Sequence, residues 1–242
     1  MNHRSAPAWL TEWEYAHRGL HSPGVPENSL AAAEAAIAAG MGIECDIQRS
    51  RDDVPMVFHD WNLERLAGKP DVTEHVVADE LEAITLLGTD QTLPRLERFL
   101  DRVGGRVPLL IEVKSQRGYD VEWTCLHVSG ILKDYAGQHA VMSFDPRVAR
   151  WFRRNSPATP CGLVIREDEH GYTQQAWQRR LAHWVAKPDF LAYHIAALPS
   201  PWVVGLRVKG LPVLTWTVNS PETRARALLY TDALISEGEG LA

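Results

Sequence analysis

The chain has 242 residues, 45% of them hydrophobic and 23% charged, which is enough apolar material for one large domain or two small ones. Its formal net charge of −6 makes nucleic acid or an anionic membrane an unfavourable partner for the molecule as a whole, although a local basic pocket is compatible with it. No stretch approaches the roughly 18 to 20 consecutive apolar residues of a membrane-spanning helix, and the chain's start lacks a signal-peptide pattern.

The three cysteines, Cys45, Cys125 and Cys161, lie far apart in the sequence and form no C-x-x-C motif. Each falls in a predicted strand or helix. We therefore expect buried free thiols and a reducing, cytoplasmic location.

The first predicted elements are a short helix over residues 6–13, a strand over 14–16 and a loop rich in glycine and proline over 20–27. Asn28 or Ser29 can cap the helix that follows, and Gly40 ends it. A second strand is predicted over 42–48. A strand, a helix and a strand in this order predict a right-handed crossover between parallel strands.

A polar turn at 51–53 and a short apolar run at 56–58 follow the second strand and lead to His59. We expect residues 60–91 to form an irregular insertion with one short helix near 79–85. A helix over 93–103 then precedes the sequence VPLLIEV at 107–113, whose apolar character is typical of a strand buried on both sides.

From there helices and strands alternate to the end of the chain. The predicted helices lie near 121–135, 146–154, 172–185, 199–208 and 221–229, and the predicted strands at 140–144, 161–165, 190–194, 212–217 and 232–236. Eight strands separated by helices predict an α/β fold, a single (β/α)8 TIM barrel over residues 1–242 with a small insertion after strand 2. Only Glu237–Ala242 follow the last strand, so we expect a truncated final helix and the N-terminal helix over the gap.

The second strand carries the most informative pattern. Glu44 and Asp46 alternate with Ile43, Cys45 and Ile47, so the two carboxylates point to one face. Two negative charges side by side repel each other, and a bound divalent cation would offset this repulsion. The alternative is an edge strand with both carboxylates in solvent and His59 as a strand-end cap. The strand alone leaves both interpretations open.

In a (β/α)8 barrel the carboxyl ends of the strands form the functional site. Glu112 would add a third carboxylate to Glu44 and Asp46, and an all-oxygen ligand set favours Mg²⁺ or Ca²⁺ over zinc. The other polar residues at strand ends suit phosphoryl chemistry: two cations for an anion, and two histidines as a general acid/base pair. These are Arg18, Lys114, His17 and His59.

Two further residues lie at predicted strand ends. Trp216, alone, would more often be core than a substrate platform, but its place at the end of a strand favours contact with the substrate. We expect His194 to form part of the pocket wall rather than to take part in the chemistry.

Seven short motifs occur in order along nearly the whole chain: AHRG (16–19), PEN (26–28), ECDI (44–47), PMVFHD (55–60), IEVK (111–114), SFDP (143–146) and TWTVN (215–219). Together they resemble the glycerophosphodiester phosphodiesterase family. The resemblance implies a barrel with the insertion at 60–91 and a metal at Glu44, Asp46 and Glu112. It also implies catalysis by His17 and His59, phosphate binding by Arg18 and Lys114, and Trp216 near the substrate.

Two further motif residues are expected to fix the loop before the first long helix. Asn28 would cap that helix, and Glu27 would orient a cation of the site. The sequence departs from the family's pattern at Arg51, where members often have Thr, and after Glu237, where the chain is short.

The expected function is metal-dependent hydrolysis of small glycerophosphodiesters to glycerol 3-phosphate and an alcohol, by two-histidine acid/base catalysis, with a cyclic phosphate as one route. A lysophospholipase D-type phosphodiesterase acting on lipids is an alternative. Another is a non-catalytic barrel that binds phosphate esters, which would be expected to lack a histidine or a metal carboxylate. The sequence leaves open the alcohol, the metal and the oligomer, and a homo-oligomer is compatible with it.

Overall fold

The computed structural model of the chain describes residues 5–116 and 118–241. The chain forms two compact units. Residues 18–138 make one, here the 18–138 unit. Residues up to His17, together with those from His139 onward, make the other, here the 139–242 unit.

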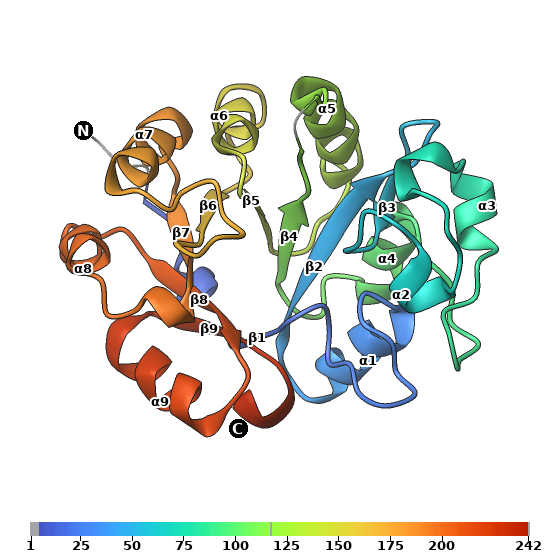
Figure 1. The fold of residues 1–242 in the computed structure, drawn as a ribbon, viewed down its shortest axis with the longest axis horizontal. Helices are drawn as coiled ribbons and strands as arrows, with labels where there is room; N and C mark the ends of the chain where they lie inside the picture. Colours follow the sequence, from blue (N-terminus) through green and yellow to red (C-terminus); the bar gives the residue numbers. More distant parts are fainter. Residues whose placement is uncertain (1–4, 117, 242) are drawn as a thin grey trace. The chain divides into compact units, whose positions relative to one another are not determined.

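The 18–138 unit is built on strands β2 (Gly42–Arg49) and β4 (Leu109–Val113), which pair in parallel. The short strand β3 (Pro55–Val57) pairs antiparallel to the end of β2. Helix α1 (Leu30–Ala38) precedes β2, α4 (Leu96–Val103) precedes β4, and α5 (Val121–Leu132) follows it (Figure 1). Both strands are buried along almost their whole length, as the apolar sequence of β4 predicts.

The predicted insertion contains more structure than the sequence indicated. It holds helices α2 (Glu64–Ala67) and α3 (Ala78–Glu82) and the 3-10 turn η2 (Thr73–His75). Helices α2 and α3 share an apolar cluster with β3 and the residues around them, made of Met56, Phe58, Leu63, Ala67, Ala78, Leu81, Ile84, Leu86 and Leu93. This cluster fixes the segment around His59, because Phe58 is 1% exposed within it.

In the 139–242 unit five parallel strands follow one another in chain order, and the first strand of the chain joins the last. The strands are β5 (His139–Ser143), β6 (Cys161–Ile165), β7 (Phe190–His194), β8 (Val213–Val218), β9 (Ala233–Ser236) and β1 (Tyr15–Ala16). Helices α6 (Pro146–Asn155), α7 (Ala176–Ala186), α8 (Pro201–Val208) and α9 (Pro221–Tyr230) separate them. The 3-10 turns are η1 (Ala8–Thr11), η3 (Ile195–Ala197) and η4 (Gly238–Gly240).

Eight parallel strands that alternate with helices make the fold a (β/α)8 barrel, as predicted. After the last strand, β9, residues Gly238–Gly240 form the 3-10 turn η4. That the whole chain acts as one domain stays a prediction. In the described part of the chain, no helix has both the length and the apolar character needed to cross a membrane.

The N-terminal helix was predicted too long. Residues 6–13 form only η1, a single 3-10 turn, because the segment is short and buries one apolar side chain, Leu10. Helix α2 was missed, since four residues carry too little periodicity to be read from a sequence. The three cysteines are buried and free, as expected.

Candidate active site

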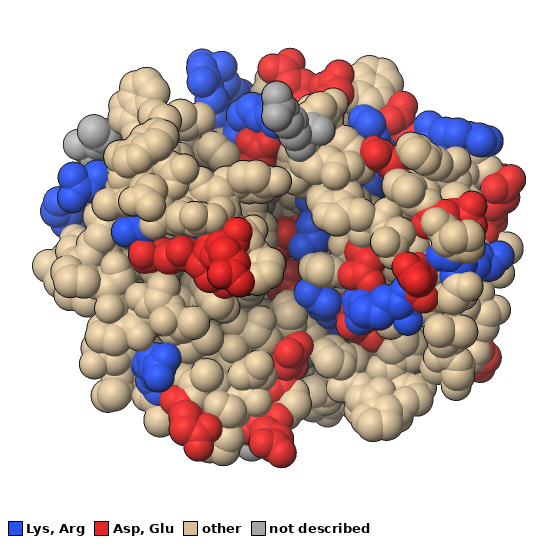
Figure 2. Space-filling model, in the orientation of Figure 1, with Lys and Arg blue, Asp and Glu red and all other residues tan. Residues whose placement is uncertain are grey.

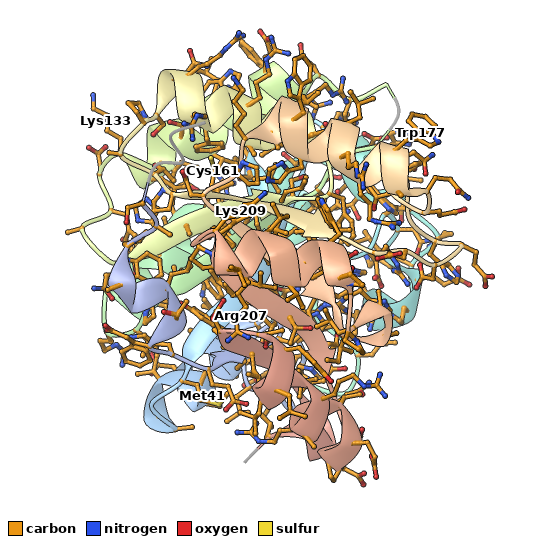
Figure 3. The ribbon with its side chains drawn as sticks, turned by 90° about the vertical axis from the view of Figure 1, so that its left-hand side faces the viewer. Met41, Lys133, Cys161, Trp177, Arg207 and Lys209 are labelled. Atoms are coloured by element: carbon orange, nitrogen blue, oxygen red, sulfur yellow. The ribbon has the colours of Figure 1, made fainter. Side chains whose placement is uncertain are left out.

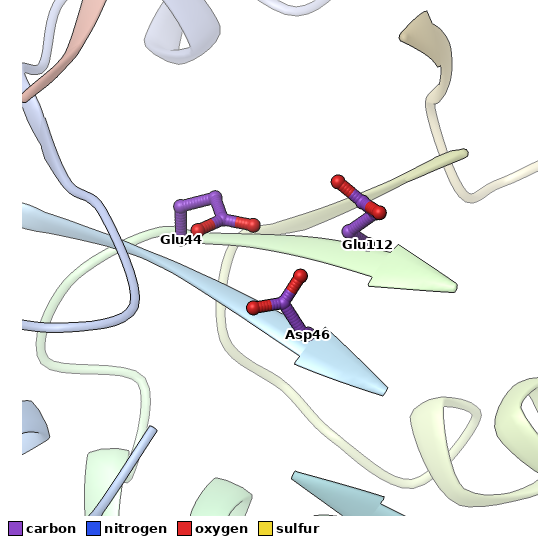
Figure 4. A group of neighbouring side chains, drawn as sticks. All are labelled: Glu44, Asp46 and Glu112. Carbon is purple, nitrogen blue, oxygen red and sulfur yellow. The ribbon is translucent and has the colours of Figure 1, made fainter. Parts of the chain in front are cut away.

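Three buried carboxylates meet on the adjacent strands β2 and β4 (Figure 4). The parallel register places Asp46 opposite Glu112, and Glu44 lies two residues earlier on the same face of β2. Their ligand atoms all lie within 4.8 Å of one another, and the residues are at most 7% exposed. The alternative of carboxylates on the solvent face of an edge strand is therefore wrong: β2 is an interior strand of its unit.

The electrostatics of the three carboxylates are unbalanced. Burial, together with the charges of Asp46 and Glu112, raises the pKa of Glu44 well above its usual range. Burial also opposes ionisation of Asp46, but the charges of Lys114, His59 and Arg18 outweigh it and hold its pKa well below its usual range. The cluster thus holds more negative charge than its surroundings compensate.

Lys114 supplies part of the missing positive charge. It is the second residue after Glu112, and its Nζ lies 2.8 Å from Oδ1 of Asp46 and 2.7 Å from Oε1 of Glu112. Burial lowers the pKa of this amine, but the two carboxylates raise it more, so Lys114 stays charged. Lys114 thus contacts two of the carboxylates, Asp46 and Glu112, that the family resemblance implies as metal ligands.

The residues present fit a divalent cation. The donor set consists of carboxylate oxygens alone, the type that Mg²⁺ and Ca²⁺ prefer. Burial and its neighbouring carboxylates disfavour ionisation of Glu44, and a bound cation beside it would relieve this penalty. Glu44, Asp46 and Glu112 are therefore the residues that would hold the ion.

Arg18 is held in the site from three directions. Its backbone N–H donates to Oε2 of Glu44 at 3.0 Å, and its guanidinium donates to Glu27 at 2.7 Å and lies 3.3 Å from Asp46. The tight turn that allows this has a φ of 57° at Arg18 and 76° at Gly19. A Cβ at Gly19 would lie 2.8 Å from Cβ of Ala32, so only glycine fits after Arg18.

Asn28 braces Asp46 rather than capping a helix. Its side-chain amide donates to Oδ2 of Asp46 at 3.0 Å, and its carbonyl oxygen accepts the backbone N–H of Asp46 at 3.1 Å. The cap of α1 is Ser29, whose hydroxyl accepts the N–H of Ala32. Of the two residues predicted as possible caps, Ser29 is confirmed and Asn28 is wrong, because the side chain of Asn28 bonds Asp46 on β2 instead.

A second charged network surrounds His59. Nδ1 of His59 lies 2.7 Å from Oδ1 of Asp60, and Asp60 accepts from Arg65 at 2.6 Å. Arg65 also donates to both carboxylate oxygens of Glu27, the residue that holds Arg18. Figure 2 shows basic and acidic side chains gathered over α2 and the neighbouring loops. His59 and Arg18 are thus joined through a chain of salt bridges within one unit.

His17 lies in the 139–242 unit, with a carboxylate partner of its own. Its backbone N–H donates to the carbonyl of Ser236, and its Nδ1 lies 2.6 Å from Oε2 of Glu237. The short segment after β9 therefore contributes Glu237. Like His59, this histidine contacts a carboxylate oxygen through Nδ1.

Trp216 belongs to an aromatic cluster of the 139–242 unit. Its indole N–H donates to the carbonyl of Ala192, which fixes the ring plane. Phe144 packs against it edge-on at 5.4 Å between centroids, and His194 lies at 5.0 Å. The guanidinium of Arg166 lies 5.7 Å from the ring centroid. His194 therefore packs beside Trp216, and its role in a pocket wall stays a prediction.

The 18–138 unit brings together eight of the predicted site residues: Arg18, Glu27, Asn28, Glu44, Asp46, His59, Glu112 and Lys114. His17 and Trp216 belong to the other unit. Sequence reasoning missed the carboxylate partners of both histidines and the chain of salt bridges that joins His59 to Arg18. Asp60 stands in the quoted motif beside His59 and could have been found there, whereas Arg65 and Glu237 carry no sequence signal.

Comparison with known proteins agrees with this geometry. The model of the glycerophosphoryl diester phosphodiesterase family matches residues 17–236. The chain belongs to this family. A curated glycerophosphodiester phosphodiesterase from Caldanaerobacter subterraneus subsp. tengcongensis is 33% identical over 230 residues, 88% of each chain.

Solved structures of the family share the fold. A glycerophosphodiester phosphodiesterase from Thermotoga maritima has a TM-score of 0.74 and 25% identity over 92% of both chains. An Oleispira antarctica phosphodiesterase in complex with the product sn-glycerol-3-phosphate has a TM-score of 0.79 and 24% identity, over 93% of this chain and 92% of that one.

These findings confirm the predicted enzyme class, a glycerophosphodiester phosphodiesterase, which is a phosphoric diester hydrolase with a small-molecule substrate. A non-catalytic barrel is thereby set aside. The roles of individual residues, the metal and the route of the reaction stay proposals.

Proposed function

We propose that the chain hydrolyses glycerophosphodiesters to glycerol 3-phosphate and an alcohol with the help of one divalent cation, Mg²⁺ or Ca²⁺. The observation that carries this proposal is the buried cluster of Glu44, Asp46 and Glu112 with Arg18 and Lys114 beside it. Burying several negative carboxylates together costs free energy unless cations compensate them. Three such carboxylates in one cluster therefore support a role in binding a cation. The three free, buried cysteines support a cytoplasmic location.

Arg18 and Lys114 bind the phosphate in this proposal. Both already contact Asp46, at 3.3 and 2.8 Å, so both are fixed before the substrate arrives. A substrate phosphate entering beside them would share these cations with the carboxylates. Because the transition state of phosphoryl transfer spreads charge over the phosphate oxygens, fixed cations stabilise it without reorganisation.

Glu44, Asp46 and Glu112 would hold the metal. When bound, a divalent cation neutralises the charge of the phosphoryl oxygens as a Lewis acid. Asn28 keeps the carboxylate of Asp46 in one orientation through two hydrogen bonds, and the backbone N–H of Arg18 does the same for Glu44. These contacts preorganise the ligand oxygens, which is the part that the protein supplies.

His17 and His59 move the protons. Each has Nδ1 at 2.6 to 2.7 Å from a carboxylate oxygen, that of Glu237 or Asp60, so each imidazole is held in one tautomer and orientation. One histidine accepts the proton of the attacking hydroxyl, and the other protonates the departing alcohol at its Nε2. His17 immediately precedes Arg18 in the chain, which keeps it beside a phosphate-binding residue.

The attacking group is the hydroxyl beside the ester carbon of glycerol. It is already tethered to the phosphorus, so attack avoids much of the entropic cost of capturing water. The product of this step is a cyclic phosphate, which water then opens to glycerol 3-phosphate.

Chelation tests the metal. Exhaustive treatment with a chelator should abolish hydrolysis of glycerophosphodiesters, and adding Mg²⁺ or Ca²⁺ should restore it. Circular dichroism before and after chelation separates loss of the ion from unfolding. Undiminished turnover by the chelated, folded protein would contradict the proposal.

A substrate in which hydrogen replaces the neighbouring hydroxyl tests the route. Turnover of this analogue should fall to a small fraction of the normal rate, because no internal nucleophile remains. A normal rate with the analogue would rule out the cyclic phosphate and leave water as the nucleophile. Phosphorus NMR of the normal reaction, which resolves cyclic from open phosphates, provides the independent measurement.

A further inference from the structure

Helices α6 and α7 have a composition opposite to that of the chain as a whole. The molecule has a net charge of −6, yet these two helices carry six arginines and no aspartate or glutamate. Helix α6 reads PRVARWFRRN and helix α7 reads AWQRRLAHWVA. Half of the arginines have carboxylate partners: Arg147 pairs with Asp145, the N-cap of its own helix, Arg153 with Asp189 and Arg179 with Glu167.

The other three arginines point into solvent. Arg150, Arg154 and Arg180 are exposed, and among the residues that the structure describes no carboxylate forms an ion pair with them. Arg150 and Arg154 lie one turn apart on α6. Lys187, the exposed C-cap of α7, adds a fourth cation. Exposed cations gathered without carboxylate partners give this surface a positive potential, which attracts an anionic partner.

Large apolar side chains lie on the same exposed surface. Trp177, Leu181 and Trp184 follow the spacing i, i+4, i+7, so they form one stripe on α7, and they are 65%, 50% and 60% exposed. The opposite side of α7 buries Ala182 and Ala186. Figure 3 shows this side of the molecule, with Trp177 projecting outward at the end of α7.

The cations and the aromatic stripe share one surface. A hollow of about 330 Å³ between the ends of α6 and α7 is lined by Arg150, Arg153, Arg154, Trp184 and Lys187 together with Val185 and Ala186. No acidic side chain lines it. We call Arg150, Arg154, Trp177, Arg180, Leu181, Trp184 and Lys187 the α6–α7 face.

We propose that the α6–α7 face docks the protein on an anionic phospholipid bilayer. Tryptophan side chains favour the boundary between headgroups and acyl chains, and arginines beside them bind the phosphates of anionic lipids. A nucleic acid would use the cations but gain nothing from the exposed Leu181, and an acidic protein patch would leave the two tryptophans unexplained. The proposal concerns attachment and does not rest on the chemistry proposed above.

Sedimentation with vesicles tests this inference. The full chain should sediment with vesicles of equal parts phosphatidylcholine and phosphatidylglycerol, and not with vesicles of phosphatidylcholine alone. Raising the salt should weaken binding, because exposed charges are screened. The triple variant R150Q/R154Q/R180Q should lower the partition coefficient about a hundredfold, since each basic residue near the surface contributes roughly a factor of five.

The double variant W177A/W184A should lower the partition coefficient about tenfold, because the apolar stripe no longer enters the headgroup region. Changes at the exposed residues of α9, R226Q/L228A, provide the matched control and should leave binding unchanged. All variants should keep the wild-type circular dichroism and hydrolytic activity on soluble substrate, which shows that they fold.

Three results would overturn the inference. The first is failure of the wild-type protein to bind anionic vesicles, or equal binding to phosphatidylcholine alone. The second is an equal loss in the α9 control. The third is a different occupant: self-association that W177A/W184A removes, or binding to a single-stranded DNA oligonucleotide in place of vesicles, would assign the face to a second copy or to nucleic acid.

Discussion

The two compact units of the chain contribute different chemistry. Strand ends of the 18–138 unit present charge: three buried carboxylates, with Arg18 and Lys114 against them. Strand ends of the 139–242 unit present rings, with Trp216 between Phe144 and His194. Buried charges must be held by partners on every side, whereas a ring needs one hydrogen bond and van der Waals contact to be fixed.

Each unit holds one of the two histidines that we propose as acid and base, and the two have similar surroundings. His59 is held by Asp60 and His17 by Glu237, both through Nδ1. The difference lies in what supports the carboxylate. Asp60 is part of a network with Arg65 and Glu27, which connects it to Arg18. The comparison predicts that substitutions at the charged strand ends of the 18–138 unit lower the rate of the chemical step. Substitutions of the aromatic residues around Trp216 should weaken substrate binding instead.

The largest effect is expected from the metal ligands. Replacing Asp46 by Asn should lower kcat/KM at least about a thousandfold, because the site loses a ligand and a contact of Lys114. Glu34→Gln, at a surface ion pair of the same unit, is the control and should keep normal activity. Steady-state kinetics measures both. An active Asp46→Asn enzyme would remove the basis for a metal at this cluster.

Glu44→Gln should separate activity from stability. Activity should fall as for Asp46, but the metal-free variant should melt no lower than the metal-free wild type, because one of three like charges is gone and the amide oxygen still accepts from Arg18. Thermal unfolding in chelator measures this. A large drop in melting temperature would mean that Glu44 is primarily a structural residue.

The histidines come next. His17→Ala and His59→Ala should each lower kcat about 10²-fold or more, and the wild-type rate should pass through a maximum with pH, because one imidazole acts protonated and the other neutral. Glu237→Gln and Asp60→Asn should cost less, since each leaves the histidine in place. His127→Ala, at a part-buried histidine on α5, is the control. Equal rates in His17→Ala and the control would exclude His17 from the reaction.

A smaller effect is expected among the rings. Trp216→Ala should raise KM about tenfold with little change in kcat, since the ring contributes contact area and no charge. Trp216→Phe should recover part of the loss, because Phe144 and His194 keep an aromatic neighbour. If Trp216→Ala lowered kcat as much as the histidine variants do, Trp216 would act on the chemical step and not on binding alone.

The smallest effect concerns stability in acid. Burial raises the pKa values of Asp60 and Glu27, but hydrogen bonds and charges outweigh it and lower both. They come from His59 and Arg65 at Asp60, and from Arg65 and Arg18 at Glu27. Their stabilisation is present above the unfolded-state pKa values of about 4 and is lost as the pH falls below them. Arg65→Gln should therefore lower the free energy of unfolding by about 1 kcal/mol at pH 7, discounted for the exposure of Arg65, and by less near pH 3.

Urea denaturation at several pH values measures this difference. Arg98→Gln, at an exposed pair with a separation of 3.9 Å, is the control and should change the free energy of unfolding by much less at either pH. A pH-independent effect of Arg65→Gln would show that the side chain stabilises by packing alone.

The order of helices and strands followed from the sequence because it depends on local patterns. Strands β6 and β7 have the predicted bounds, and most other boundaries shift by one to four residues. The failures are short elements, such as η1 and α2, where a single turn carries no periodicity. The insertion was predicted as irregular because its cohesion comes from an apolar cluster of residues distant in the sequence.

The sequence by itself determined which chemistry the chain can perform. The two-residue period of a strand put Glu44 and Asp46 on one face, and parallel strands put Glu112 and Lys114 at the same edge. Only the tertiary structure decided how these groups are held. Asn28 braces Asp46, and Glu237 reaches His17 from a position 220 residues away. Such pairs depend on the packing of distant segments, and no local pattern encodes a contact whose partner lies at the other end of the chain.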